Sequence, residues 1–200
     1  GIIDTVRGRH AEAIRAFTKT EAIYLPLAYA SGAAQAQISR GTVHFIRGEL
    51  QAAGAAFRAA MATATRFQAL QMLGIAELNL GAVYTSLSEY ATAKDLFLQA
   101  LAHFEAVGAT TSMAQAAAFA AAVCPGNEFD ALVLRAEDAL RRCGPSLHRS
   151  VAQRVLAEHL ALRGRFAEAR AHLREAEAIY GAPTEQWAMT AVRAVECDLA

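Results

Sequence analysis

Apolar residues of two sizes recur along this chain at helical spacing, with polar residues between them. In residues 73–108, Leu80 and Phe97 are large apolar positions, whereas Gly81 and Ala93 are small. Large side chains that meet small ones allow two helices to pack closely against each other. A short turn-forming stretch separates the two apolar runs. The segment therefore predicts a pair of antiparallel helices.

The same pattern recurs at a constant separation, which indicates an internal repeat. A small residue followed four positions later by an aromatic one occurs as Ala13 with Phe17, Ala53 with Phe57, and Ala93 with Phe97. The three alanines are spaced 40 residues apart. Beyond Gly108 the pattern weakens, and Leu132 and Ala169 take the equivalent positions. A fixed period of this length is typical of helical repeat arrays, in which each repeat packs on its neighbours.

Proline and glycine positions divide the chain into helix pairs. All four prolines fall in predicted breaks between helices, because proline cannot continue a helix. The predicted repeats are approximately 1–26, 27–66, 67–108, 109–144, 145–181 and a partial repeat 182–200. We find no alternating run of β-branched residues bounded by turn signals. The sequence therefore predicts an all-α, single repeat domain over residues 1–200 that starts on a second helix and ends on a first helix.

Both ends of the predicted array carry apolar surface with no neighbouring helix to cover it. After a Gly-Ala-Pro break at residues 181–183, the last predicted helix carries Trp187, Val192 and Leu199 on one stripe. At the other end, the helix around Phe17 lacks most of its partner helix. Uncovered apolar flanks are unfavourable in water. We therefore expect either a longer array or a homodimer through the terminal helices.

Residues 73–108 closely resemble one known repeat family. They match the tetratricopeptide signature L-G-x2-Y…A-x3-F…A at Leu80, Gly81, Tyr84, Ala93, Phe97 and Ala100. Two positions depart from the family pattern, because Glu77 replaces its tryptophan and Glu105 its frequent proline. The resemblance implies a right-handed α-solenoid of antiparallel helix pairs, with about 9–10 helices. The long period is similar to the repeats of large ATP-dependent bacterial transcription activators of the MalT type.

The resemblance also implies where a partner binds. In tetratricopeptide repeats the first helices line the concave face, and ligands generally bind there. The matching positions in this chain are Gln35, Ile38, Thr42, Phe45, Ile75, Leu78, Ala82, Thr85, Arg154 and Glu158. This wall is mostly small and apolar and lacks the residues that clamp a terminal carboxylate, so an apolar helix or an extended peptide suits it. The alternative is that these side chains pack against one another.

Charge is balanced overall but unevenly distributed. The chain has 19 basic and 19 acidic residues, so no global charge directs it to nucleic acid or to a membrane surface. Residues 135–174 nevertheless contain nine arginines and four acidic residues. An alternative function is therefore a nucleic-acid-binding helical repeat that uses this arginine-rich region. The zero net charge and the lack of interleaved aromatic residues argue against it.

No catalytic, cofactor-binding or metal-binding pattern stands out in the sequence. It has no nucleotide-binding glycine motif and no H-E-x-x-H, and its six histidines share no ligand spacing. Cys124, Cys143 and Cys197 lack CxxC spacing, which favours a reducing compartment such as the cytoplasm. The uncharged stretch 106–127 is only weakly apolar, so it predicts a buried helix and not a membrane span. We expect no enzymatic activity, no cofactor and no metal.

Together these features predict a non-catalytic scaffold that holds a protein or peptide partner. The resemblance implies that such a scaffold is the sensor or interaction module of a bacterial regulatory or signalling protein in the cytoplasm. Neither a membrane nor nucleic acid is the expected partner.

Overall fold

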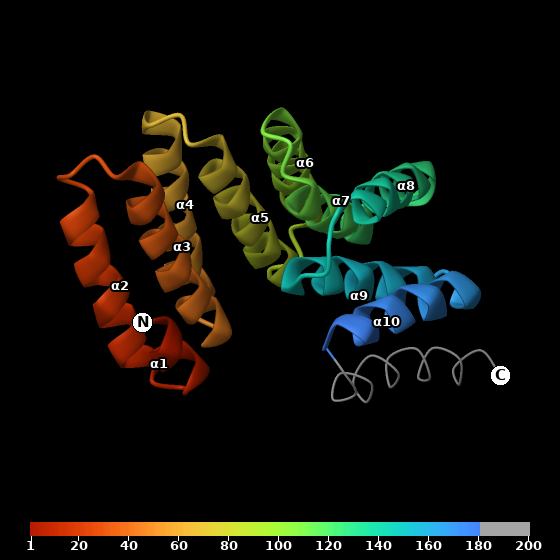
Figure 1. The fold of residues 1–200 in the computed structure, drawn as a ribbon, viewed down its shortest axis with the longest axis horizontal. Coiled ribbons are helices and arrows are strands. Elements are labelled where there is room, and N and C mark those ends of the chain that lie inside the picture. The colour runs from red at the N-terminus through yellow and green to blue at the C-terminus, as the bar shows by residue number, and fades with distance from the viewer. Residues whose placement is uncertain (181–200) are drawn as a thin grey trace. The chain divides into compact units, whose positions relative to one another are not determined.

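The computed structural model describes residues 1–180, and this part of the chain is helical with no strands (Figure 1). Helices that follow one another in sequence pack as adjacent pairs, which is the arrangement of a solenoid-like helical repeat. The all-α fold class predicted from the sequence is therefore confirmed. The last predicted helix, with Trp187 and Leu199, lies outside the described residues, and so does Cys197.

The chain divides into two compact units, and the division follows Gly108. This position coincides with the predicted boundary between the repeats 67–108 and 109–144. The first unit comprises residues 1–108 and the second begins at Ala109. Each unit has its own helix pairs.

Helices of equal length recur in the first unit. The short helix α1 (Ile2–Val6) is followed by α2 (His10–Tyr24), α3 (Ala30–Ile46), α4 (Leu50–Arg66), α5 (Leu70–Ser86) and α6 (Tyr90–Ala106). From α2 onward each helix begins 20 residues after the one before it, and α3 to α6 are each 17 residues long. The 40-residue repeat seen in the sequence is therefore built from two halves of equal length.

Each helix of the first unit is followed by one residue with positive φ. In chain order these residues are Gly8, Ala28, Gly48, Gln68, Ser88 and Gly108. After α5, the amide of Ser88 donates to the Thr85 carbonyl at 3.0 Å, and the amide of Glu89 donates to the Tyr84 carbonyl at 2.9 Å. This pair of hydrogen bonds is the Schellman motif, which satisfies carbonyls that a helix end leaves without partners. The same pair of bonds follows α1, α2, α3 and α4, so the chain reverses in the same way at each link between helices of this unit.

Glycine against a phenylalanine ring is a second recurring feature of the first unit. A Cβ added at Gly41 in α3 would lie 2.6 Å from Cε1 of Phe57 in α4. At Gly81 in α5 an added Cβ would overlap the ring of Phe97 in α6 in the same way. Both rings are only 1% exposed, so they have no space into which to move. The close approach of these helices therefore requires glycine at both positions.

The core of the first unit is continuous from one repeat to the next. One apolar cluster draws side chains from α3, α4, α5 and α6, namely Ile38, Ala53, Phe57, Ala60, Ala76, Leu80, Val83 and Leu96. Because alanines fill many of the contact positions, neighbouring helices lie close together and a few large rings occupy the space that remains. Each repeat thus completes the core of its neighbour.

The second unit has the same succession of helix pairs but a different packing. It contains α7 (Thr110–Val123), α8 (Gly126–Arg142), α9 (Leu147–Ala161) and α10 (Phe166–Tyr180). Of the two helices of the preceding pair, α9 packs mainly against α7 and touches α8 only slightly, whereas in the first unit α5 packs more against α4 than against α3. Helix α8 is therefore largely separated from the following pair, α9 and α10.

Extended links accompany this change in packing. Cys124 after α7 has φ −98° and ψ 134°, and Cys143 after α8 has φ −102° and ψ 146°. Pro125 follows Cys124 directly, and proline disfavours helical geometry in the residue before it. Ser146 then caps α9, because its hydroxyl oxygen accepts a hydrogen bond from the Arg149 amide at 3.1 Å. These links do not repeat the left-handed turn of the first unit.

Substitutions at two equivalent left-handed positions should change the free energy of unfolding in opposite directions. Gln68 and Gly48 both follow a helix of the first unit, at φ 54° and 73°. Because this conformation disfavours any residue with a Cβ, Gln68→Gly should raise the free energy of unfolding by about 0.5–1 kcal/mol, and Gly48→Ala should lower it by about 1 kcal/mol. Urea unfolding measures both changes. The control is Gly144→Ala, at a link glycine without positive φ, which should change little.

The glycine–phenylalanine contacts give a second prediction. Gly81→Ala should lower the free energy of unfolding by about 1–3 kcal/mol, because the new methyl group overlaps the immobile Phe97 ring. Gly54→Ala is the matched control. Gly54 is also buried within a helix, but a Cβ there would meet the flexible end of Arg58 at 3.3 Å and Cδ1 of Leu80 at 3.7 Å, an ordinary contact distance. It should therefore be neutral or stabilising. Equal effects of the two substitutions in thermal unfolding would contradict the proposed packing.

Candidate partner-binding clefts

Four of the concave-face positions predicted in the first unit are packed into or against its core. Ile38 is 4% exposed and Leu78 is 7% exposed. Phe45 and Ile75 are half-buried and pack against the apolar cluster that contains Ile38. These side chains hold the helices together and offer little apolar surface to a partner, as in the packing alternative that the sequence left open.

The other predicted positions of the first unit have more exposed surface. Thr42, Ala82 and Thr85 are half-buried, and each threonine hydroxyl donates to the carbonyl four residues back in its own helix at 3.0 Å. Gln35 is exposed, and its side-chain amide donates to the hydroxyl of Ser39 at 3.3 Å. Among the predicted positions of this unit, Gln35 is the best placed to meet a partner.

Gln35 lines a cleft of about 460 Å³ at the beginning of the first unit, which we call the N-terminal cleft. Its lining comes from α1, α2, the link after α2, α3 and α5, and consists of Ile2, Phe17, Thr20, Tyr24, Tyr29, Ser31, Gly32, Gln35, Ala36, Ser39 and Met72. None of these side chains carries a charge. The cleft therefore presents aromatic and aliphatic surface with hydroxyl and amide groups between.

Two tyrosines form a wall of the N-terminal cleft. The rings of Tyr24 and Tyr29 meet edge to face, with their centroids 5.0 Å apart. Gly32 makes room for them, since a Cβ at this position would lie 2.6 Å from Cδ2 of Tyr24. Tyr29 remains 55% exposed. A tyrosine pair of this kind offers both apolar contact area and hydroxyl groups, which is the combination that protein interfaces favour.

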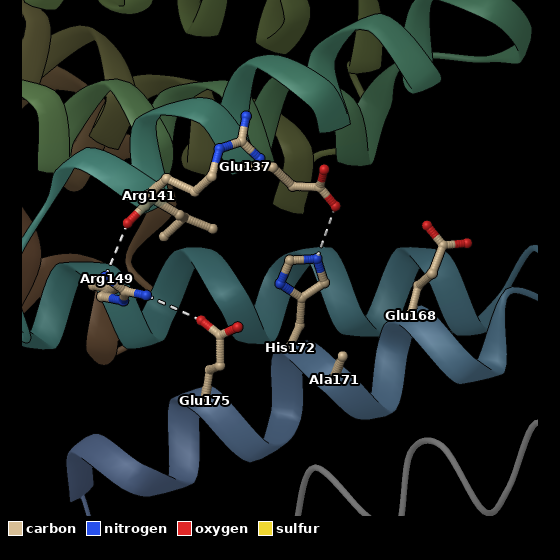
Figure 2. Close-up of a pocket in the computed structure, with 8 residues that line it drawn as sticks. Glu137, Arg141, Arg149, Glu168, Ala171, His172 and Glu175 are labelled. Atoms are coloured by element: carbon tan, nitrogen blue, oxygen red, sulfur yellow. Dashed lines mark hydrogen bonds and ion pairs between the residues drawn. The ribbon is translucent and has the colours of Figure 1, made fainter.

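A second cleft lies within the second unit and was not anticipated from the sequence. It measures about 400 Å³ and is lined by α8, α9 and α10 (Figure 2). Its lining residues are Glu137, Leu140, Arg141, Arg149, Glu168, Ala171, His172 and Glu175, and we call it the charged cleft. The predicted positions Arg154 and Glu158 on α9 are half-buried and do not line it.

Arg149 connects three parts of the charged cleft. Its guanidinium donates to the carbonyls of Leu140 at 2.9 Å and Cys143 at 2.6 Å, at the end of α8. It also pairs with the Glu175 carboxylate of α10 at 3.0 Å (Figure 2). The same carboxylate accepts a hydrogen bond from the buried side-chain amide of Gln153 at 2.5 Å. Arg149 therefore has a structural role, because it satisfies helix-end carbonyls and joins α8 to α10.

Other polar groups of this cleft also have close partners within the second unit. Nε2 of His172 lies 3.4 Å from the Glu137 carboxylate. Hydrogen bonds from Arg165 to Glu168, the shorter at 2.6 Å, lower the pKa of the Glu168 carboxyl group and keep it ionised. A charged ligand would have to displace these internal partners. The charged cleft is therefore a weaker candidate for a binding site than the uncharged N-terminal cleft.

Several arginines of the region 135–174 make contacts within the second unit. The guanidinium carbon of Arg163 lies 3.7 Å from the ring centroid of Phe129, and the same group donates to the Cys124 carbonyl at 3.1 Å. Arg165 pairs with the carboxylates of Asp130 and Glu168, each at 2.6 Å. An arginine that is neutralised inside the fold contributes less to phosphate binding. These contacts weaken the case for a nucleic-acid surface.

A contact between a buried carboxyl group and an imidazole in the first unit also escaped the sequence analysis. Glu77 of α5 stands at the tryptophan position of the family signature and is 3% exposed, and Nδ1 of His103 in α6 lies 2.8 Å from its carboxylate. Gln37, one repeat earlier, is also buried, and its amide donates to the Glu21 carboxylate at 2.8 Å. Gln37 and Glu77 are 40 residues apart and therefore occupy equivalent positions in the repeat. This alignment of two polar residues was the sequence signal for a polar position in the core.

Residues 1–180 contain no group of three or more His, Cys, Asp or Glu side chains that could hold a metal ion. Over the same range, no helix combines the length and the apolar character needed to cross a membrane. Comparisons with known proteins find no family model and no curated protein that matches this chain.

The buried Glu77 predicts a pH-dependent stability. Burial raises the pKa of its carboxyl group, and the hydrogen bond with His103 offsets part of this rise. A raised folded-state pKa means that wild type loses stability as the pH rises through that value. Glu77→Gln should therefore raise the free energy of unfolding at pH 7, and this gain should disappear as the pH falls towards the ordinary carboxyl pKa.

Urea unfolding between pH 4 and 8 measures this effect. Glutamine occupies the equivalent position at Gln37, so the substitution is compatible with the repeat. The control is Glu12→Gln, which removes one carboxylate charge from an exposed position of α2. If Glu77→Gln is less stable than wild type at every pH, the attraction between Glu77 and His103 outweighs the cost of burial.

Proposed function

We propose that this chain is a non-catalytic helical-repeat module that binds a segment of a partner protein in the N-terminal cleft. The observation that carries the proposal is an uncharged cleft of about 460 Å³, walled by the Tyr24–Tyr29 pair. Clefts that combine apolar surface with a few polar groups are the usual form of a recognition site.

The lining defines the chemistry of the bound segment. Phe17, Tyr24 and Met72 offer apolar surface, while Gln35 and Thr20 offer hydrogen-bonding groups at the same face. A segment with an apolar, uncharged contact face suits this surface. A charged group would lose its hydration in the cleft without gaining an opposite charge among the lining residues.

The wider assignment rests on the resemblance to tetratricopeptide repeats. The concave side formed by first helices is the ligand side in that family, and Gln35 belongs to the first helix α3. The 40-residue period supports a second step, in which the module is the sensor or interaction part of a bacterial regulatory protein. The nucleic-acid alternative is less well supported, since Arg149, Arg163 and Arg165 make internal contacts.

Selection of ligands from a peptide library tests the proposal. A phage-displayed library of random 16-residue peptides is selected on the chain, and fluorescence polarisation measures the affinity of the enriched peptides. Tyr29→Ala should weaken their binding at least tenfold, about 1.4 kcal/mol, as expected for an interface tyrosine. Tyr90→Ala is the matched control, because Tyr90 is 52% exposed but does not line the cleft. Equal losses for the two variants, or no enriched peptide, would contradict the proposal.

A further inference from the structure

Polar side chains join helix α8 to the α9–α10 pair. Helix α8 touches α9 only slightly, and the charged cleft lies between α8 and α10. Near the start of α8, Asp130 pairs with Arg165 at 2.6 Å, and at its end two backbone carbonyls accept hydrogen bonds from Arg149. An arginine keeps its charge throughout the physiological pH range, so these two links do not respond to pH there.

A third link, between His172 of α10 and Glu137 of α8, depends on the protonation of an imidazole. Nε2 of His172 lies 3.4 Å from the Glu137 carboxylate (Figure 2). Histidine is the side chain that ordinarily gains its proton between about pH 8 and pH 5, whereas a carboxyl group does so below about pH 5. Over this range the link changes from a contact with a neutral ring to an ion pair.

The geometry of this link is that of a neutral ring. Its 3.4 Å exceeds both the roughly 2.7–2.9 Å of a charge-assisted hydrogen bond and the 2.6 Å of the Arg165–Asp130 pair. Nδ1 of His172 is buried and has no hydrogen-bond partner. In a charged ring both nitrogens carry a proton and both need an acceptor. A gain of charge should therefore change the contacts of this ring and shorten the one with Glu137.

The charges around His172 favour a closer contact with Glu137 when the ring is charged. The cleft is lined by three carboxylates and two guanidiniums, namely Glu137 and Arg141 of α8, Arg149 of α9, and Glu168 and Glu175 of α10. Arg149 pairs with Glu175, and Arg165, just before α10, pairs with Glu168. These two pairs largely cancel. The Arg141 side chain is 67% exposed, so solvent screens its charge. The carboxylate in contact with the ring therefore decides the sign.

We propose that His172 and Glu137 form a pH-sensitive latch between α10 and α8, which strengthens when the imidazole gains a proton and weakens when it loses one. The ion pair exists only in the folded chain, so its contribution to stability is present at low pH and is lost as the pH rises. Because α8 has little other contact with the α9–α10 pair, a weaker latch lets α8 separate from α10 and opens the charged cleft. The latch lies in the second unit and does not involve the N-terminal cleft.

Amide hydrogen exchange of the whole chain, followed by mass spectrometry, tests the latch. The exchange rate of the α8 amides in Glu137→Gln is divided by that in wild type at the same pH, so the intrinsic pH dependence of exchange cancels. At pH 6 the substitution should speed exchange at least about fivefold, because only wild type can form the ion pair. At pH 8 it should speed exchange less than about twofold, because the ring is then neutral in both proteins.

Asp130→Asn is the matched control on the same helix. It removes a carboxylate whose partner, Arg165, keeps its charge, so it should speed exchange of α8 by the same factor at pH 6 and pH 8. A second control places Glu137→Gln in a His172→Gln background. It should have no effect at either pH, because the group that titrates is gone.

Three results would overturn the latch. An equal effect of Glu137→Gln at pH 6 and pH 8 would mean that the contact does not depend on the charge of the imidazole. A larger effect at pH 8 would mean that the neutral ring holds Glu137 more firmly than the charged one. Unchanged exchange of α8 at both pH values would mean that other contacts hold this helix in place.

Discussion

The structure of the first unit depends on one conformational constraint, a left-handed residue after every helix. Because these residues recur every 20 positions, each helix ends in the same hydrogen-bonded turn and each pair is placed in the same way. The contact of Gly41 with Phe57 then recurs as that of Gly81 with Phe97. Equal helices, equal links and a repeated close contact are three consequences of the same turn.

Fold and helix pairing could be read from the sequence, because the packing of small against large residues is local. The alanines at 13, 53 and 93 gave the 40-residue period directly. The 20-residue half-period is harder to recognise, since Ala28, Gln68 and Ser88 occupy left-handed positions that glycine usually marks. The altered packing of α9 was also not predicted, because it depends on how extended links at Cys124 and Cys143 direct the following helices.

The sequence predicted the candidate site only in part, because it does not give the distance between packed helices. A family register identifies the face of a helix, but not how close the next helix lies. With so many alanines at the contacts, Ile38 and Leu78 are enclosed by their neighbours, and only Gln35 lies in a cleft. Tyr24 and Tyr29 were missed because they belong to a second helix and its link, which the register does not assign to the ligand side.

Tight packing also limits which surfaces of a repeat of this kind are accessible to a partner. Along a regular stretch, the first helices fill the space between their neighbours, and the polar groups at the tryptophan position pair inside the core, as Glu77 does with His103. Surface for a partner is therefore found in clefts between helices. In the second unit such a cleft lies beside α8, which is largely separated from α9, and its carboxylates pair with Arg149 and Arg165. The N-terminal cleft of the first unit has no charged side chain in its lining. The chemistry of the lining, and not a place on the concave face as such, therefore distinguishes the two candidate sites.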